Sequence, residues 1–330
     1  MNDERTLDLL EAKIQELREL NETDGIDLLS DISRLETKLE SMRAELYTSL
    51  TDWDRVKIAR HPQRPYALDY IERLCSDFYE LRGDRLSGDD RALLTGLARF
   101  DGQPVVLLAI QKGRTPEESK ERNFGMPRPQ GYRKARRAMA LAERFSLPVI
   151  SLIDTPGAYP GLESEASNIG GAIAESLLAM TTLGVPTIAA IIGEGGSGGA
   201  IAVGAADRVI MMENAIYSVI SPEGAAAILW KAKDRTKEAA SALGLTAVRL
   251  LDLGAIDAVV PEPLGGAHKD FDRAAAALHS ALAAELLAVR DVPTEDLLEA
   301  RYRRYRAAGV FNTLEDASEE PPSDAPGSES

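Results

Sequence analysis

The chain has 330 residues, of which 44% are hydrophobic, enough for a sizeable core in one large domain or two smaller ones. Its net charge of -15 argues against nonspecific nucleic-acid binding by the whole surface, and its one cysteine, Cys75, excludes an intramolecular disulfide or a cysteine-rich zinc site. No apolar run approaches the roughly 18 residues of a membrane span, and the charged N-terminus lacks the apolar region of a signal peptide. We therefore expect a cytoplasmic protein with no membrane or nucleic-acid partner.

The first stretch, residues 1–52, predicts a helical hairpin. Apolar residues step by three and four from Leu7 to Leu17, pause at Asp24-Gly25, and resume from Leu28 to Leu46. A hairpin of two helices is too thin to bury this stripe alone. Two alternatives remain open: the hairpin packs on its own domain, or it packs on a partner subunit.

The next part of the chain predicts a helix and a β-hairpin. Two prolines between Arg60 and Pro65 break the helical pattern, which resumes from Tyr66 to Leu81. The segments 91–100 and 104–110 are typical of strands, and Asp101-Gly102 between them suits a type I′ turn.

The charge balance reverses between Lys112 and Arg137. Nine lysines and arginines face three glutamates there, an excess of six positive charges on an acidic chain. The segment Asn123–Pro127 interrupts this run and indicates a loop, and 131–145 predicts an amphipathic helix. The basic residues are either a solvated helix face or a clamp for phosphates or a carboxylate, because arginine and lysine neutralise such groups.

Two buried strands each end in a glycine-rich turn. The segment 148–153 leads into Asp154–Gly161, and 187–192 leads into Gly193–Ala200, with a helix expected over 200–205 and a crossover helix over 169–183. Turns that follow successive parallel strands meet at one edge of a sheet. We therefore expect a site there.

The second glycine turn permits two kinds of chemistry. No Lys-Ser/Thr follows its glycines, so it is not a P-loop. It matches Gly-x-Ser-x-Gly around Ser197, with Asp257 and His268 following in the order of a serine hydrolase. Alternatively, the backbone N–H groups of Gly198 and Gly199 at a helix start form an oxyanion hole. The scattered histidines, His61, His268 and His279, do not have the spacing of a metal site.

The remainder alternates short strands and helices before an acidic tail. Strands are expected over 208–212, 215–220 and 255–260, and helices over 222–230, 237–243, 247–253, 270–289 and 294–307. Ser221 suits the N-cap of the helix that follows it. The expected domains are the hairpin over 1–52, a main domain over 53–312, and a disordered tail over 313–330.

Several long motifs in order resemble one known family. They are 61–66, 111–113, 122–127, 131–135, 154–161, 193–200, 217–224 and 261–268. Together they resemble the α subunit of bacterial acetyl-CoA carboxylase carboxyltransferase, from about residue 5 to residue 307.

The resemblance implies an α/β, crotonase-like (ClpP/crotonase) fold, in which ββα units form a spiral with perpendicular sheets. It implies transfer of a carboxyl group from carboxybiotin to acetyl-CoA, giving malonyl-CoA for fatty-acid biosynthesis. The implied partners are a zinc-ribbon β subunit in an α2β2 heterotetramer, the biotin carboxyl carrier protein that delivers carboxybiotin, and biotin carboxylase, with ATP bound by the complete complex. No metal is expected in this chain.

The resemblance also assigns roles to residues. The backbone oxyanion hole corresponds to Gly198 and Gly199 and would receive the biotin ureido oxygen. The expected substrate-binding residues are Gly157, Ala158, Tyr159, Gly195, Gly196, Lys112, Arg122, Asn123 and Phe124.

One segment departs from the family. Where the family has Gly-Ala-Glu-Glu-Arg-Gly-Gln, this chain has Glu163–Ile169, without the arginine and the glutamine. Besides the serine hydrolase, a further alternative is a non-catalytic scaffold homologue that only assembles the complex.

Overall fold

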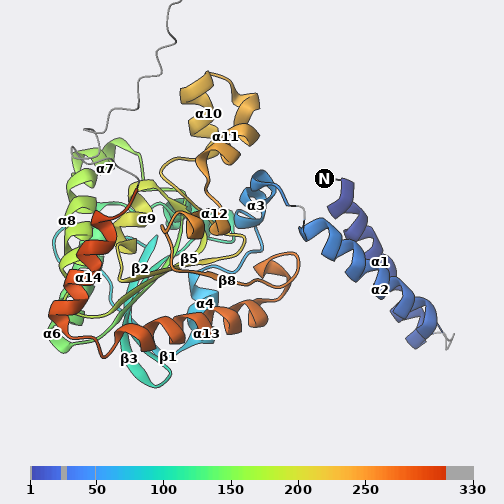
Figure 1. The fold of residues 1–330 in the computed structure, drawn as a ribbon, viewed down its shortest axis with the longest axis horizontal. Helices are drawn as coiled ribbons and strands as arrows, with labels where there is room; N and C mark the ends of the chain where they lie inside the picture. The colour runs from blue at the N-terminus through green and yellow to red at the C-terminus, as the bar shows by residue number, and fades with distance from the viewer. Residues whose placement is uncertain (1, 24–27, 49, 310–330) are drawn as a thin grey trace, which may run out of the picture.

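The computed structural model describes residues 2–23, 28–48 and 50–309. Its first element is a hairpin of α1 (Asn2–Thr23) and α2 (Leu29–Thr48), which extends away from the main body (Figure 1). Ile14, Ile32 and Leu39 are 5–7% exposed. Both predicted helices are present, and they bury Ile14, Ile32 and Leu39 between them, while Leu10, Leu17, Leu35 and Met42 are only partly buried.

The expected helix from Tyr66 to Leu81 is wrong in its second half. After α3 (Asp52–Ala59), the helix α4 spans only Ala67–Leu74, and Cys75–Glu80 forms strand β1. This strand pairs antiparallel with β2 (Leu93–Phe100). Pairing with a distant strand determines the conformation here, and the helical spacing of apolar residues does not reveal it.

The predicted β-hairpin is confirmed. β2 pairs antiparallel with β3 (Gln103–Ile110) in unbroken register from Leu93↔Ile110 to Phe100↔Gln103. Asp101 and Gly102 connect the strands with φ angles of 49° and 75°. A type I′ turn requires a positive φ at both central residues, which aspartate tolerates and glycine adopts without cost.

The described residues form an eight-stranded mixed sheet in the order β1-β2-β3-β4-β5-β6-β8. From β3 onward the neighbouring strands are parallel: β4 (Val149–Thr155), β5 (Thr187–Gly196), β6 (Arg208–Met212) and β8 (Ala258–Val260). The short strand β7 (Ile216–Ser218) lies off this path and pairs with the last three residues of β5.

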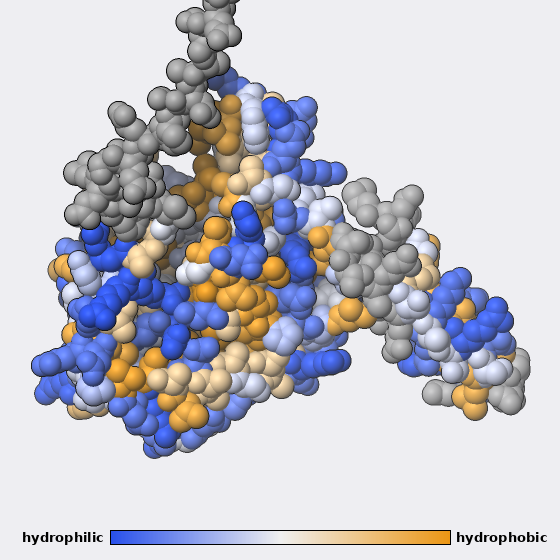
Figure 2. All heavy atoms as spheres, in the orientation of Figure 1, coloured by the Kyte–Doolittle hydropathy of each residue, from blue (hydrophilic) through white to orange (hydrophobic). Residues whose placement is uncertain are grey.

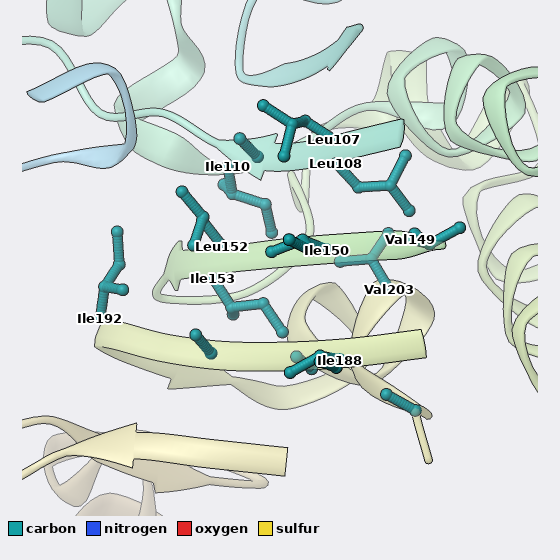
Figure 3. Packing of buried hydrophobic residues seen from close by; sticks show 14 of the residues in the cluster. Leu107, Leu108, Ile110, Val149, Ile150, Leu152, Ile153, Ile188, Ile192 and Val203 are labelled. Atoms are coloured by element: carbon teal, nitrogen blue, oxygen red, sulfur yellow. The ribbon is translucent and has the colours of Figure 1, made fainter. Parts of the chain in front are cut away.

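Helices cover both faces of this sheet. Every residue of β4 is buried, which requires cover on both sides. One group is α6 (Pro129–Phe145) and α9 (Ser197–Gly204), with α8 (Ile169–Thr182) and α14 (Thr294–Arg306) packed behind; the other is α4 and α13 (Phe271–Val289). Figure 3 shows the aliphatic core between β3, β4 and β5, where Leu108, Ile150 and Ile188 lie on adjacent strands.

The remaining elements are short. They are α5 (Pro116–Glu121), α7 (Leu162–Ala166), α10 (Pro222–Trp230), α11 (Thr236–Leu243), α12 (Ala247–Asp252) and 3-10 turns at Asn123–Gly125, Lys233–Arg235 and Ala267–Lys269. Ser221 caps α10 as predicted, accepting a hydrogen bond from the Gly224 N–H. The predicted tail, 313–330, lies outside the described residues. Within the described part of the chain, no helix is both long and apolar enough to cross a membrane.

Candidate functional site

The two glycine turns lie against each other at the ends of β4 and β5. These strands are parallel neighbours, and Thr155 pairs with Gly195. A Cβ added to Gly196 would lie 2.2 Å from the carbonyl oxygen of Pro156, and one added to Gly199 would lie 2.6 Å from the carbonyl carbon of Gly157. Only glycine permits this backbone contact, so the expectation that the turns meet at one edge of the sheet is confirmed.

The helix after the second turn begins earlier than the sequence suggests. Strand β5 runs to Gly196 and α9 begins at Ser197, not at Ala200. Gly198 and Gly199 therefore lie in the first helical turn, whose N–H groups have no partner within the helix. The N-cap Gly196 supplies no side-chain cap. These donors, at the positive end of the helix dipole, remain available to an anionic oxygen.

The first turn forms a wall beside α9. The Thr155 hydroxyl accepts the Gly157 N–H at 3.0 Å and donates to the Gly157 carbonyl at 2.7 Å, which fixes the start of the turn. The Tyr159 N–H donates to the Pro127 carbonyl at 3.0 Å, and the Arg128 guanidinium lies 4.6 Å from the centre of the Tyr159 ring. The turn is thereby joined to the loop before α6.

A cluster of charges lies directly beneath both turns. Lys112, two residues beyond β3, places its Nζ 2.7 Å from Asp154 Oδ1 and 2.9 Å from Glu194 Oε1. Asp154 Oδ1 also accepts the backbone N–H of Glu194. Burial alone would lower the pKa of Lys112, but the two carboxylates outweigh it and raise that pKa. Lys112 thus links the strands that lead into the two turns.

Two further arginines extend this network toward the N-terminal segment. Arg60 Nε donates to Glu194 Oε2 at 2.7 Å, and Arg60 also pairs with Glu223 at the start of α10. Burial opposes ionisation of Glu194, yet Lys112 and Arg60 together lower its pKa. Arg64, fully buried, donates to the Ile192 carbonyl at 2.7 Å and is paired with Glu262.

The structure places the expected site residues in two groups. Gly157, Ala158, Gly195, Gly196 and Gly199 lie where the two turns contact each other, with Tyr159 at the side, and Gly198 lies beside them and faces Ile173 of α8. The Asn123–Gly125 segment packs on Lys112, since a Cβ on Gly125 would lie 2.6 Å from Lys112 Cγ. Phe124 is 58% exposed.

Arg122 lies apart from the turns. Its guanidinium donates to the Arg91 carbonyl at 3.0 Å. Within the described residues, no hydrogen bond or ion pair joins it to either turn.

Of the charged residues beneath the turns, the sequence analysis expected Lys112 to bind substrate, and the structure pairs it with Asp154 and Glu194. Glu194 and Arg60 were not assigned a role. Glu194 does carry a signal, because it is a carboxylate at the end of a fully apolar strand and inside a glycine run. A buried carboxylate requires a partner. That requirement indicates a nearby cation, but not that it is Lys112 and Arg60.

The residues of a serine hydrolase are not brought together. His268 stacks on His61 with ring centres 3.8 Å apart, and Asp257 pairs with Arg304 and accepts the Val209 N–H. In the described part of the chain neither makes a hydrogen bond with Ser197. A nucleophilic serine needs a base within hydrogen-bond reach, so this arrangement does not favour the hydrolase alternative.

The segment that departs from the family has a structural use. Leu162–Ala166 forms α7, and Glu163 lies 3.3 Å from Arg128. Asn168 adopts a left-handed conformation at φ 62° and caps α8 by accepting the Gly171 N–H. Across residues 2–23, 28–48 and 50–309, no group of three or more potential metal ligands occurs.

Solved structures define the class of this fold. The chain resembles transcarboxylase 12S, with a TM-score of 0.57 and 21% identity over 70% of this chain and 44% of that one. It also resembles a chain of a Pseudomonas malonate decarboxylase hetero-tetramer, with a TM-score of 0.55 and 21% identity over 67% and 89% of the two chains. The fold is that of the crotonase-like carboxyltransferases, as the sequence motifs imply.

Sequence relatives define the family within that class. The model of the acetyl co-enzyme A carboxylase carboxyltransferase-like family matches residues 1–309. The α subunits of acetyl-coenzyme A carboxylase carboxyl transferase from Thioalkalivibrio sulfidiphilus and Paraburkholderia phymatum are each 53% identical over 302 residues, covering 92% of this chain and 95% and 94% of theirs. The chain therefore belongs to the acetyl-CoA carboxylase carboxyltransferase family.

Proposed function

We propose that this chain is the α subunit of an acetyl-CoA carboxylase carboxyltransferase, which forms malonyl-CoA for fatty-acid biosynthesis. The observation that carries the proposal is the uncapped start of α9, which contains Gly198 and Gly199 and where Gly199 packs against Gly157 and Ala158. Such a helix start stabilises negative charge on an oxygen without any side-chain nucleophile.

The chain's own residues fit carboxybiotin delivered by a carrier protein. When bound, carboxybiotin would supply the carboxyl group by breaking its N–C bond, and the ureido nitrogen freed in this way would accept the proton that acetyl-CoA loses as its carbon binds the carboxyl group. The N–H groups of Gly198 and Gly199 receive the ureido oxygen. Gly157, Ala158 and Tyr159 line the opposite wall, and Gly195 and Gly196 allow the two backbones to approach. Lys112 acts as a positioning residue for both turns.

Three further residues expected to bind substrate, Arg122, Asn123 and Phe124, lie on or next to one loop. Asn123 and Phe124 lie on the loop that packs on Lys112, and the exposed Phe124 ring is free to contact a substrate. Arg122 is half-buried, directly precedes that loop and donates to the Arg91 carbonyl. Arg122 can bind the substrate only if the substrate extends beyond Asn123.

A second subunit is required to complete the site. Exposed apolar side chains gather on and near α10 and α12, including Val219, Ile228, Leu229, Val248 and Leu253, which are 55–74% exposed. Figure 2 shows hydrophobic surface around these elements. Exposed apolar side chains that gather in one region of the surface mark protein interfaces. We assign it to a zinc-ribbon β subunit in an α2β2 heterotetramer, working with the biotin carboxyl carrier protein and biotin carboxylase in the cytoplasm.

We propose that the chain is divided into the three parts that the sequence suggests. Residues 53–312 form the carboxyltransferase domain, residues 1–52 form a separate hairpin, and residues 313–330 form a tail without a catalytic role. The separation of the hairpin from the body supports the first boundary (Figure 1).

Reconstitution tests the proposal. The chain is combined with the β subunit, and carboxylation of biocytin at the expense of malonyl-CoA is measured. We expect transfer by the complex and none by the chain alone, because one oxyanion hole is encoded here and the second must come from the partner. Transfer by the chain alone contradicts the shared site, and an assembled complex without transfer supports the scaffold alternative.

A further inference from the structure

A concave surface, separate from the site at the glycine turns, lies on the outer side of the helical layer, between α6 and α8. It has a volume of about 560 Å³, within the range of small-molecule sites. The loop before β2, the middle of α6 and the first half of α8 form its walls. Its lining residues are Asp84, Arg85, Leu86, Arg133, Arg136, Arg137, Ala140, Asn168, Ala172 and Glu175.

Four arginines give this groove a local positive charge on an acidic chain. Arg133, Arg136 and Arg137 are spaced i, i+3 and i+4 on one face of α6, and Arg85 approaches from the facing loop. The two carboxylates that line the groove already have hydrogen-bond or ion-pair partners. Asp84 accepts the backbone N–H groups of residues 86–88, and Glu175 is paired with Arg136.

Two of the four arginines, Arg85 and Arg137, have guanidinium N–H groups without a hydrogen-bond partner among the described residues. Arg85 makes no side-chain hydrogen bond or ion pair among the described residues. Arg137 donates from one terminal nitrogen to the Arg82 carbonyl at 3.0 Å, but its buried Nε has no partner in that same set. Burial and the like charge of Arg85 both lower the pKa of Arg137. The positive charges of Arg85 and Arg137 are thus held close together, and both groups still have N–H donors that could bind an anion.

We propose that this groove binds the diphosphate group of a small phosphorylated ligand. Guanidinium groups bind phosphate oxygens through two parallel hydrogen bonds, and each such contact is charge-assisted. Arg136 and Arg137 lie about one helical turn from Arg133, a separation that suits two adjacent phosphates. An anion placed there satisfies the spare donors and offsets the repulsion between Arg85 and Arg137.

The groove is separate from the glycine turns. A Cβ on Gly198 would lie 3.4 Å from Ile173 Cδ1, so Ile173 faces α9. Asn168, Ala172 and Glu175, spaced i, i+4 and i+7, occupy another face of α8 and line the groove. The helix α8 therefore stands between the two sites, and the proposal does not depend on the carboxyltransferase activity.

Calorimetric titration of the full-length chain in phosphate-free buffer tests the proposal, with inorganic pyrophosphate, ADP and orthophosphate as probes. We expect saturable binding of one pyrophosphate per chain, at least about tenfold tighter than orthophosphate and weaker between about 50 and 300 mM salt. ADP binding as tightly as pyrophosphate indicates that the diphosphate alone is recognised. Tighter binding of ADP indicates a nucleotide, and both results support the proposal.

Matched variants separate this groove from general electrostatic attraction. Arg85→Gln removes a charge without removing a structural bond, and we expect pyrophosphate binding at least about fivefold weaker. Arg144→Gln makes the same change on the same helix outside the groove and leaves binding unchanged. Circular dichroism checks that both variants are folded. Absence of saturable binding at about 1 mM pyrophosphate, equal affinity for orthophosphate, or equal weakening by both variants overturns the proposal.

Discussion

Nζ of Lys112 lies 2.9 Å from Oε1 of Glu194, and this buried ion pair joins the end of β3 to the strand that enters α9. The same ammonium contacts Asp154 at the end of β4, next to the other glycine turn. One ammonium group therefore bridges two carboxylates, while Arg60 supplies a second positive charge to Glu194, and the bridge sets the positions of both turns at once.

Replacing Lys112 by methionine should destabilise the protein. Asp154 and Glu194 would face each other without their shared cation, and breaking a buried pair costs about 3–5 kcal/mol. We expect carboxyl transfer by the reconstituted enzyme to fall by at least about tenfold. Urea unfolding and turnover assays measure the two effects. Lys120→Met, the same change at an exposed position of α5, is the control, and equal behaviour of the two variants contradicts the role of Lys112.

Two neighbouring glycines should respond differently to alanine. A Cβ at Gly199 would lie 2.6 Å from Gly157, whereas one at Gly198 would meet Ile173 at an ordinary 3.4 Å. Gly199→Ala should therefore displace the facing turn and reduce turnover about 100-fold, the cost of losing an oxyanion-hole donor. Gly198→Ala should reduce it by less than about tenfold, because its N–H remains. Similar turnover for both variants would show that the backbone contact is unimportant.

The hydroxyl of Ser197 should be dispensable. Ser197→Ala keeps every N–H group of the first turn of α9, so turnover should fall by less than about tenfold, or roughly 1.4 kcal/mol. A nucleophilic serine requires nearly complete loss, together with labelling of the wild type by a fluorophosphonate probe. Both results together in the assembled enzyme would replace the oxyanion mechanism with a hydrolase mechanism.

The stability of the protein should fall in mild acid because of His268. Burial, and then the electrostatic effect of the neighbouring His61, lower the pKa of His268 from 6.5 to about 4. The unfolded chain therefore takes up this proton first as the pH falls, and the folded state loses stability between about pH 6.5 and pH 4. Between about pH 7.5 and pH 5 the loss should be on the order of 2 kcal/mol.

A variant isolates this contribution. His268→Gln removes the titrating ring, so the loss of unfolding free energy between the two pH values should shrink. Chemical unfolding at both pH values measures the difference, and an identical pH dependence in wild type and His268→Gln would refute this origin.

Sequence patterns predict those parts of the fold that depend on local periodicity. The apolar runs of β4 and β5 and the glycines after them indicate strands and close backbone contact, and both are found. The strand Cys75–Glu80 was missed because its partner lies more than a dozen residues away, and its own spacing favours a helix. The ion pairs beneath the site join residues 82 and 134 positions apart, and no local pattern encodes such pairing.

The buried pair of Arg64 and Glu262 has a consequence for synthesis of the chain. The two residues are 198 positions apart, and both side chains are fully buried in the folded protein. At about 5–20 residues per second, the ribosome needs roughly 10–40 s after Arg64 to add Glu262. During that interval the carboxylate with which this guanidinium is paired in the folded protein has not yet been made. The end of β5, where Arg64 binds the Ile192 carbonyl, can reach its final packing only after Glu262 has emerged from the ribosome.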